Sequence, residues 1–234
     1  MTGVVEKDFV RPLYRGDSIL PFRGASSVSA VIPWSGNRLL DGHDEQLDTY
    51  PGLAQWWRAA EKVWERHRKS DRLSLAEQLD YRNKLSRQLP ATKYRVVYAA
   101  SGMYSAAAVV TDEKVIIEHQ LYWGSATDIN EARFLAAFLN SETLTMAVRP
   151  LQPRGEHNPR HFDKSVFQLP IPLYDPADEV HRRLADLAEQ AEMIAADVLL
   201  PAKRFETQRN VIRQALTQQG VAVEIDSIVK DLFA

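Results

Sequence analysis

The sequence predicts an α+β fold: a small mixed or antiparallel sheet packed by helices, with a C-terminal helical tail. Short apolar runs alternate with proline and glycine over residues 4–34, a pattern typical of short strands and turns. Residues 93–123 hold three further β-rich runs. Helical spacing of apolar residues marks 53–88, 130–148 and most of the chain after Asp178.

After the N-terminal strands, residues 51–148 predict two helices, then a sheet, then a further helix. A helix with a broad aromatic face opens at Pro51 and Gly52, and a second is expected from Ser74 to Gln88. The runs KYRVVYAA, YSAAAVVTD and VIIEHQLYW, joined by tight turns, predict an antiparallel meander over 93–123. Asp128 or Asn130 can cap the helix that follows, which we expect to end near Val148.

The second half predicts a long loop and then helices. Residues 149–164 contain three prolines and a glycine without periodicity, and 166–176 is expected to form a short strand ended by prolines. Pro201 and Gly220 divide the helical tail, which finishes in a short last turn. We therefore expect two domains, an α+β domain over 1–176 and a helical extension over 177–234.

Composition excludes several classes of protein. The chain is 45% apolar and 26% charged, which is typical of globular proteins and excludes wholesale disorder. The absence of cysteine excludes disulfide frameworks and thiolate metal sites. No apolar run approaches the roughly 20 residues of a membrane span, and no signal peptide is seen. We expect a cytoplasmic protein that does not enter membranes.

The net charge of −2 means that any nucleic-acid surface must concentrate its basic residues on one face. The irregular loop is the first candidate, because guanidinium groups suit phosphate contacts and bidentate contacts with guanine. Its candidate residues are Arg149, Arg154, Arg160, Lys164, His157 and His161. The alternative is an ordinary solvated loop. The two histidines have a metal-compatible spacing but no third ligand nearby, so no metal site is expected.

Other candidates lie outside the loop. Arg15 occupies the tip of a turn, Trp123 ends the third β-rich run, and three basic residues of the aromatic helix offer secondary contacts with the DNA backbone: Lys62, Arg66 and Arg68. Each has a structural alternative, a surface ion pair for Arg15 and core packing for Trp123. No phosphate-binding glycine loop, nucleophile elbow or His-Glu-x-x-His motif is present, which favours a binding module over an enzyme.

Several short sequence segments occur in the same order as in one protein family. They include PLYRGDSILPFR (12–23), a helix ending in Leu139-Asn140-Ser141, the loop RGEHNPRHFDK (154–164) and LPIP (169–172). Over about residues 9–190 this order resembles the C-terminal target-recognition region of adenine-specific DNA methyltransferases of restriction–modification type. The resemblance is distributed along the chain and has no single sharp signature.

The resemblance implies that catalysis and target recognition belong to separate domains. In that family a separate Rossmann-like domain binds S-adenosylmethionine and carries the catalytic loop, while the C-terminal region clamps the duplex and reads the target. We therefore expect this chain to bind double-stranded DNA, to hold no cofactor and to have no catalytic activity by itself. Whether the sequence is a fragment or a separate recognition subunit stays open.

A second hypothesis is a protein-interaction module. The helix after Asp178 has heptad-like apolar spacing and could dock a catalytic methyltransferase domain, a separate methyltransferase subunit or another partner. Its apolar residues are Leu184, Leu187, Ala191, Ile194 and Ala195. The alternative for this stripe is packing on the chain's own core.

Overall fold

The computed structural model describes residues 2–25, 27–152 and 161–233. Helices and small sheets confirm the predicted α+β class, and the chain divides into two compact units. Unit 1 comprises Met1–Leu13, Ser27–Thr92 and Glu113–Ile116. Unit 2 comprises Tyr14–Ser26, Lys93–Asp112 and Ile117–Ala234. Residues 177–234, which the sequence sets apart as a helical extension, lie in unit 2 together with residues 117–176.

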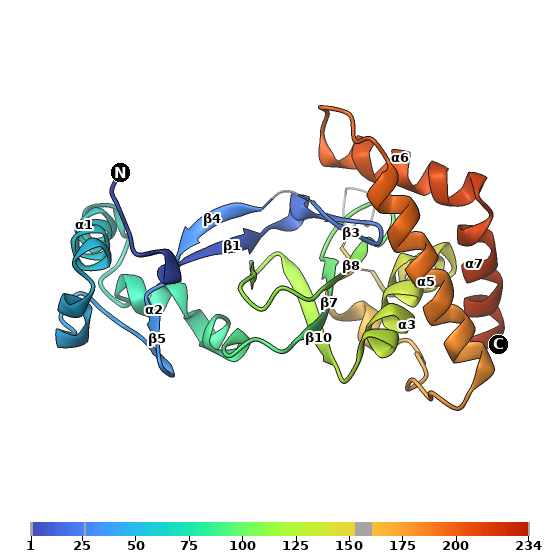
Figure 1. Ribbon diagram of the computed structural model, residues 1–234, viewed down its shortest axis with the longest axis horizontal. Helices are drawn as coiled ribbons and strands as arrows, with labels where there is room; N and C mark the ends of the chain where they lie inside the picture. The colour runs from blue at the N-terminus through green and yellow to red at the C-terminus, as the bar shows by residue number, and fades with distance from the viewer. Residues whose placement is uncertain (1, 26, 153–160, 234) are drawn as a thin grey trace. The chain divides into compact units, whose positions relative to one another are not determined.

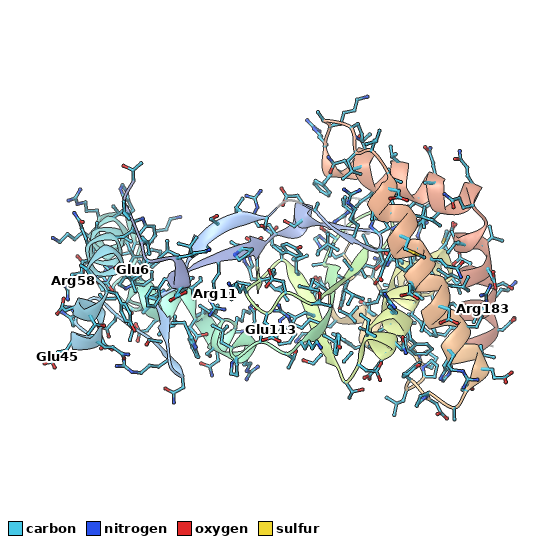
Figure 2. All side chains as sticks on the ribbon, in the orientation of Figure 1. Glu6, Arg11, Glu45, Arg58, Glu113 and Arg183 are labelled. Carbon is cyan, nitrogen blue, oxygen red and sulfur yellow. The ribbon has the colours of Figure 1, made fainter. Side chains whose placement is uncertain are left out.

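The aromatic helix of unit 1 forms as predicted. This helix, α1 (Pro51–His67), buries Leu53, Ala54 and Trp57 in a cluster with Phe9. Its first turn is capped from a distance, because the Glu6 carboxylate accepts hydrogen bonds from the N–H groups of Gly52 (2.9 Å) and Leu53 (2.7 Å) (Figure 2). Hydrogen bonds from its own backbone and from these two amides lower the pKa of Glu6, against a smaller opposing effect of burial.

The second helix of unit 1 is much shorter than predicted. α2 spans only Leu75–Leu79, where the sequence predicts a helix over 74–88. Arg82 and Asn83 have φ angles of 58° and 57°, and such left-handed residues end a right-handed helix. The Asp80 carboxylate then accepts hydrogen bonds from the N–H groups of Leu85 and Ser86, both at 2.9 Å. Two 3₁₀ turns therefore replace the expected helix.

The strands of unit 1 are short. A three-stranded sheet has the order β4-β1-β9, in which β1 and β4 are antiparallel, and β5 and β6 form a separate hairpin. Their bounds are β1 Val10–Tyr14, β4 Val28–Val31, β5 Trp34–Ser35, β6 Arg38–Leu39 and β9 Ile116–Ile117. Two of these strands, β1 and β9, run across the boundary between the units in the chain.

The sheet of unit 2 is antiparallel but is not the predicted meander. Its order is β10-β7-β8, so β7 (Tyr94–Ala99) pairs with β8 (Ala107–Val110) on one side and with β10 (Leu121–Ala126) on the other. The third apolar run was predicted as one strand. A turn in which the Leu121 N–H bonds to the Glu118 carbonyl oxygen divides it into β9 and β10, which join different sheets. A small hairpin of β2 (Ile19–Leu20) and β3 (Arg23–Gly24) completes the strands described in this unit.

Helices cover this sheet. The helix predicted over 130–148 is divided into α3 (Ile129–Asn140) and α4 (Glu142–Val148), because Ser141 caps α4 through a bond from the Leu144 N–H to its Oγ (3.0 Å). The C-terminal segment forms α5 (Glu179–Asp197), α6 (Phe205–Gln218) and α7 (Val221–Leu232). Figure 1 shows α5 running beside both α3 and α7.

The chain after residue 165 differs from prediction at two points. α7 is a full helix and not the short last turn that was expected, and it begins after Gly220, whose φ is 80°. The strand predicted over 166–176 is absent among the described residues. A 3₁₀ helix, Asp163–Gln168, is followed there by irregular backbone. Pro170, Pro172 and Pro176 lack the N–H groups that a strand ladder needs. None of the described helices is long and apolar enough to cross a membrane.

Candidate nucleic-acid interface

An open hollow of about 680 Å³ lies in unit 2, where the ends of β7 and β10 meet the turn after Tyr14. The start of α6 contributes Phe205 to its wall, and the chain that follows the long loop contributes His161 and Asp163. We call this space the hollow. Its size is that of a small-molecule or nucleobase site. Its polar lining includes Arg15, Asp17, Ser101, Glu118, His119, Gln120, His161 and Asp163.

Arg15 is positioned by the short 3₁₀ helix Gly16–Ser18. The Arg15 backbone N–H donates to Ser18 Oγ at 3.1 Å, and its guanidinium pairs with Asp17 at 2.9 Å while both side chains stay nearly half exposed. Arg209 of α6 supports this turn from the interior by donating to the carbonyl oxygens of Gly16 and Ile19, both at 2.9 Å. Burial lowers the pKa of Arg209 to about 10, so it stays charged at neutral pH.

His161 is held at the rim by β-type contacts. It forms an antiparallel bridge with Ser101, and the next residue, Phe162, donates its N–H to the Ala100 carbonyl oxygen at 2.8 Å. Phe162 is 1% exposed and packs in the core of unit 2. The C-terminal end of the predicted DNA-binding loop is therefore anchored at the hollow.

Tyr122 lines the hollow and belongs to a group of three aromatic rings with Tyr98 and Phe167. Tyr98 and Tyr122 are cross-strand partners whose rings stack at 5.4 Å, and Phe167 meets both edge-on at 6.3 and 6.4 Å. Tyr98 donates its hydroxyl to the Asp163 carbonyl oxygen at 2.7 Å. Burial raises the pKa of both tyrosines, so the phenols are neutral at pH 7. Phe167 stays 66% exposed, which leaves an apolar face open beside polar groups.

The structure brings part of the predicted site together. Arg15 and His161, 146 positions apart in the sequence, both line the hollow. Lys164 follows on the next 3₁₀ turn and is exposed, as is Arg149 at the end of α4. Arg154, His157 and Arg160 lie outside the described residues.

Trp123 does not line the hollow, and its neighbour Tyr122 does. Side chains alternate across a strand, so a shift of one residue changes the face. The sequence shows two adjacent aromatics at a strand end and does not decide which faces the loop. Sequence reasoning also missed Phe167 and Tyr98, whose only signal was their aromatic character within otherwise ordinary runs.

The predicted basic residues of α1 belong to unit 1. Lys62 and Arg66 are exposed, and neither takes part in an ion pair within the described ranges. Arg68 is different, because it ends α1, is partly buried and pairs with Asp71 at 3.1 Å. Lys62 and Arg66 are thus available to a ligand, and Arg68 is already engaged.

The charge of the hollow favours hydrogen-bond donors as ligands. Among the described residues that line the hollow, Arg15 is the only arginine, against the acidic residues Asp17, Glu118 and Asp163, when the two lining histidines are counted as neutral. Carboxylates accept hydrogen bonds from the exocyclic amino groups of cytosine and adenine, whereas a phosphate would be repelled. The hollow therefore suits the edges of bases better than the DNA backbone.

Within residues 2–25, 27–152 and 161–233, no group of three or more histidine, aspartate or glutamate side chains is placed to hold a metal ion. No protein-family model matches the chain, and no curated protein matches it at a significant level.

Proposed function

We propose that this chain is the sequence-specific DNA-binding, or target-recognition, module of an adenine-N6 DNA methyltransferase or restriction–modification enzyme. One observation carries the proposal: a hollow lined by acidic residues, histidines and Arg15 is also lined by Tyr122, whose ring meets the exposed ring of Phe167. Base edges need this combination of acceptors, donors and an apolar face. The resemblance of residues 9–190 to such target-recognition regions supports the same function.

The side chains of the hollow suggest distinct contacts. Asp17, Glu118 or Asp163 would accept hydrogen bonds from the amino group of cytosine or adenine, and Arg15 would donate to the N7 and O6 atoms of guanine. Phe167 would contact a thymine methyl group or stack on an exposed base. In this proposal methyl transfer and S-adenosylmethionine belong to another domain or subunit, which also holds the catalytic residues.

The alternative interaction module receives less support. Leu184, Leu187, Ala191 and Ala195 are at most 1% exposed, because α5 packs them into the core that α3 and α7 share. Ile194 is partly buried against the same core. A stripe that is already covered by its own unit offers no apolar face to a partner.

The proposal is tested by binding of the 234-residue chain to DNA. Fluorescence anisotropy with random-sequence duplex at 50 and 200 mM salt measures general affinity, and selection from a random library identifies the preferred site. We expect Arg15→Ala and Phe167→Ala each to weaken binding to the selected site by about 1–3 kcal/mol while leaving random duplex nearly unaffected.

The matched control is Arg183→Ala. This arginine, labelled on α5 in Figure 2, pairs with Glu224 of α7 and is not among the residues that line the hollow. We expect it to bind both duplexes as the unmodified chain does. Absence of binding to random and selected duplex at 50 mM salt would refute the proposal, and so would equal losses for the Arg183 and Arg15 variants.

A further inference from the structure

Affinity for DNA comes largely from contacts between basic side chains and phosphates, and the described lining of the hollow holds one arginine, Arg15, and no lysine. Unit 2 as a whole carries 16 basic and 19 acidic residues, a formal net charge of −3. Unit 1 carries 13 basic and 12 acidic residues, a net charge of +1. A DNA-binding chain with this division of charge needs a concentrated basic surface, and unit 1 is the more positive of the two units.

The basic residues of unit 1 gather in one part of the sequence. Residues 62–87 contain eight basic and four acidic residues. Two of the earlier arginines are already paired, Arg38 with Asp44 and Arg58 with Asp48. After Asp80 the next acidic residue is Asp112, so residues 81–111 contain no acidic side chain.

We call residues 81–87 the basic turn. Its cations Arg82, Lys84 and Arg87 are all exposed, and none is in an ion pair within the part of the chain that the structure describes. Tyr81 is 45% exposed, and the Arg82 guanidinium lies 5.3 Å from the centre of its ring. The turn thus presents an aromatic ring and three exposed cations that are in no described ion pair, all within seven residues.

The backbone of the basic turn is held in place. Asp80, the acidic residue that precedes the turn in the sequence, accepts the N–H groups of Leu85 and Ser86 with one carboxylate oxygen, which closes the turn. Leu85 and Leu89 are 4% and 9% exposed and anchor it in a core cluster with Ile32. Anchoring matters, because cations on a fixed backbone lose less freedom on binding than cations on a flexible tail.

We propose that the basic turn binds the phosphate backbone of duplex DNA through Arg82, Lys84 and Arg87, and supplies the sequence-independent part of the affinity. This inference rests on the proposed function. It assigns phosphate contacts to residues that sequence reasoning had not selected, and it leaves base contacts to the hollow. The basic residues of α1 are weaker candidates, because Glu61 and Glu65 are interspersed with Lys62 and Arg66.

The test uses the whole chain and a triple variant, Arg82→Gln, Lys84→Gln and Arg87→Gln. Binding to random-sequence duplex is measured by anisotropy from 50 to 200 mM salt. Three lost phosphate contacts lower the slope of log K against log salt by about 2.7, so the ratio of Kd at 200 mM to Kd at 50 mM falls by about 40-fold. The variant's relative preference among sequences should not change.

Two further variants make the result specific. Removing three exposed cations from the C-terminal helices, with Arg182→Gln, Arg183→Gln and Lys230→Gln, changes the net charge equally and should leave the slope unaltered. Exchanging Arg82→Lys, Lys84→Arg and Arg87→Lys keeps the charges and should keep the slope. If circular dichroism shows that the triple glutamine variant is unfolded, Arg87→Gln alone should lower the slope by about 0.9.

The outcomes separate the two proposals. If the unmodified chain binds duplex and the folded triple variant shows the same slope, the basic turn is not a phosphate site, and the proposed function stands. If the unmodified chain binds no duplex at 50 mM salt, the proposed function and this inference are both refuted. If the C-terminal control variant also shows a lower slope of log K against log salt, the effect comes from net charge alone. That result would overturn the assignment of the basic turn.

Discussion

The side chain of Asn140 joins the end of α3 to the outer edge of the unit 2 sheet. Its Oδ1 accepts from the Ala107 N–H at 3.0 Å, and its Nδ2 donates to the carbonyl oxygens of Ala107 and Ala136, both at 2.9 Å. Ala107 belongs to β8, and its backbone groups face away from β7, because the Ala99 N–H bonds to the adjacent Ala106 carbonyl oxygen. The Asn140 side-chain amide therefore satisfies the Ala107 backbone groups as a neighbouring strand would.

We predict that Asn140→Ala destabilises the protein by about 3 kcal/mol. Asn140 is 7% exposed and Ala107 is fully buried, so the Ala107 N–H loses its partner without gaining water. An orphaned buried amide costs about 1–3 kcal/mol, and the remaining lost hydrogen bonds add about 1 kcal/mol. The Ala107 carbonyl keeps a second donor, the Phe22 N–H at 2.8 Å, which limits the loss.

Thermal unfolding followed by circular dichroism measures this effect. About 3 kcal/mol corresponds to a fall in Tm of roughly 6–12 °C for a chain of this length. Asn130→Ala, on an exposed position of the same helix, is the matched control and should change stability by less than about 0.5 kcal/mol. An Asn140→Ala variant within 2 °C of the unmodified protein would refute the reasoning.

An aspartate at the same position gives a pH-dependent variant. Asn140→Asp keeps an acceptor for the Ala107 N–H but places a carboxylate against two carbonyl oxygens, so burial should raise its pKa in the folded state. A raised folded pKa means that stability is highest when the group is protonated and is lost as the pH rises through that pKa. The variant should therefore unfold at a lower temperature at pH 7.5 than at pH 5, after correction for the unmodified chain.

Three further predictions concern polar contacts inside unit 2. Burial raises the pKa of Glu192 despite its bond to Arg133 (3.0 Å). In urea unfolding the unmodified protein should therefore gain stability relative to Glu192→Gln as the pH falls from 7 towards 4.5. A loss of stability relative to that variant over the same pH range contradicts the assignment. Arg209→Met leaves the Gly16 and Ile19 carbonyl oxygens without their donor and should cost about 2–3 kcal/mol by thermal unfolding, whereas exposed Arg204→Met should cost little. Tyr98→Phe removes the bond to the Asp163 carbonyl oxygen and should cost about 1 kcal/mol in the same assay; no change would mean that this bond does not hold the turn.

Part of the candidate site was predictable from the sequence. Local composition identified Arg15 as the tip of a turn and His161 as part of an irregular basic segment, and both line the hollow. Their meeting was not predictable, because it depends on the bridge between His161 and Ser101 and on the support of the Gly16 turn by Arg209. Those contacts join segments between 60 and about 190 positions apart in the chain.

The roles of individual arginines were likewise not predictable from the sequence. Arg209 and Arg213 look like exposed cations in a polar helical sequence, but the structure uses both as internal donors to carbonyl oxygens, Arg213 to that of Ser105. Burial accordingly lowers the pKa of each to about 10. Whether a guanidinium is free for a ligand depends on which carbonyls lie opposite it, and only the folded chain determines that.

The sequence by itself determined the α+β class, the positions of α1 and α3, and the interruptions at Pro201 and Gly220. Helices are predictable because their hydrogen bonds connect residues four apart and their apolar spacing is local. The tertiary structure decided which strands pair, where the third apolar run divides, and how the chain distributes between two units. These features depend on contacts between distant segments, whose free energy is absent from any local window of sequence.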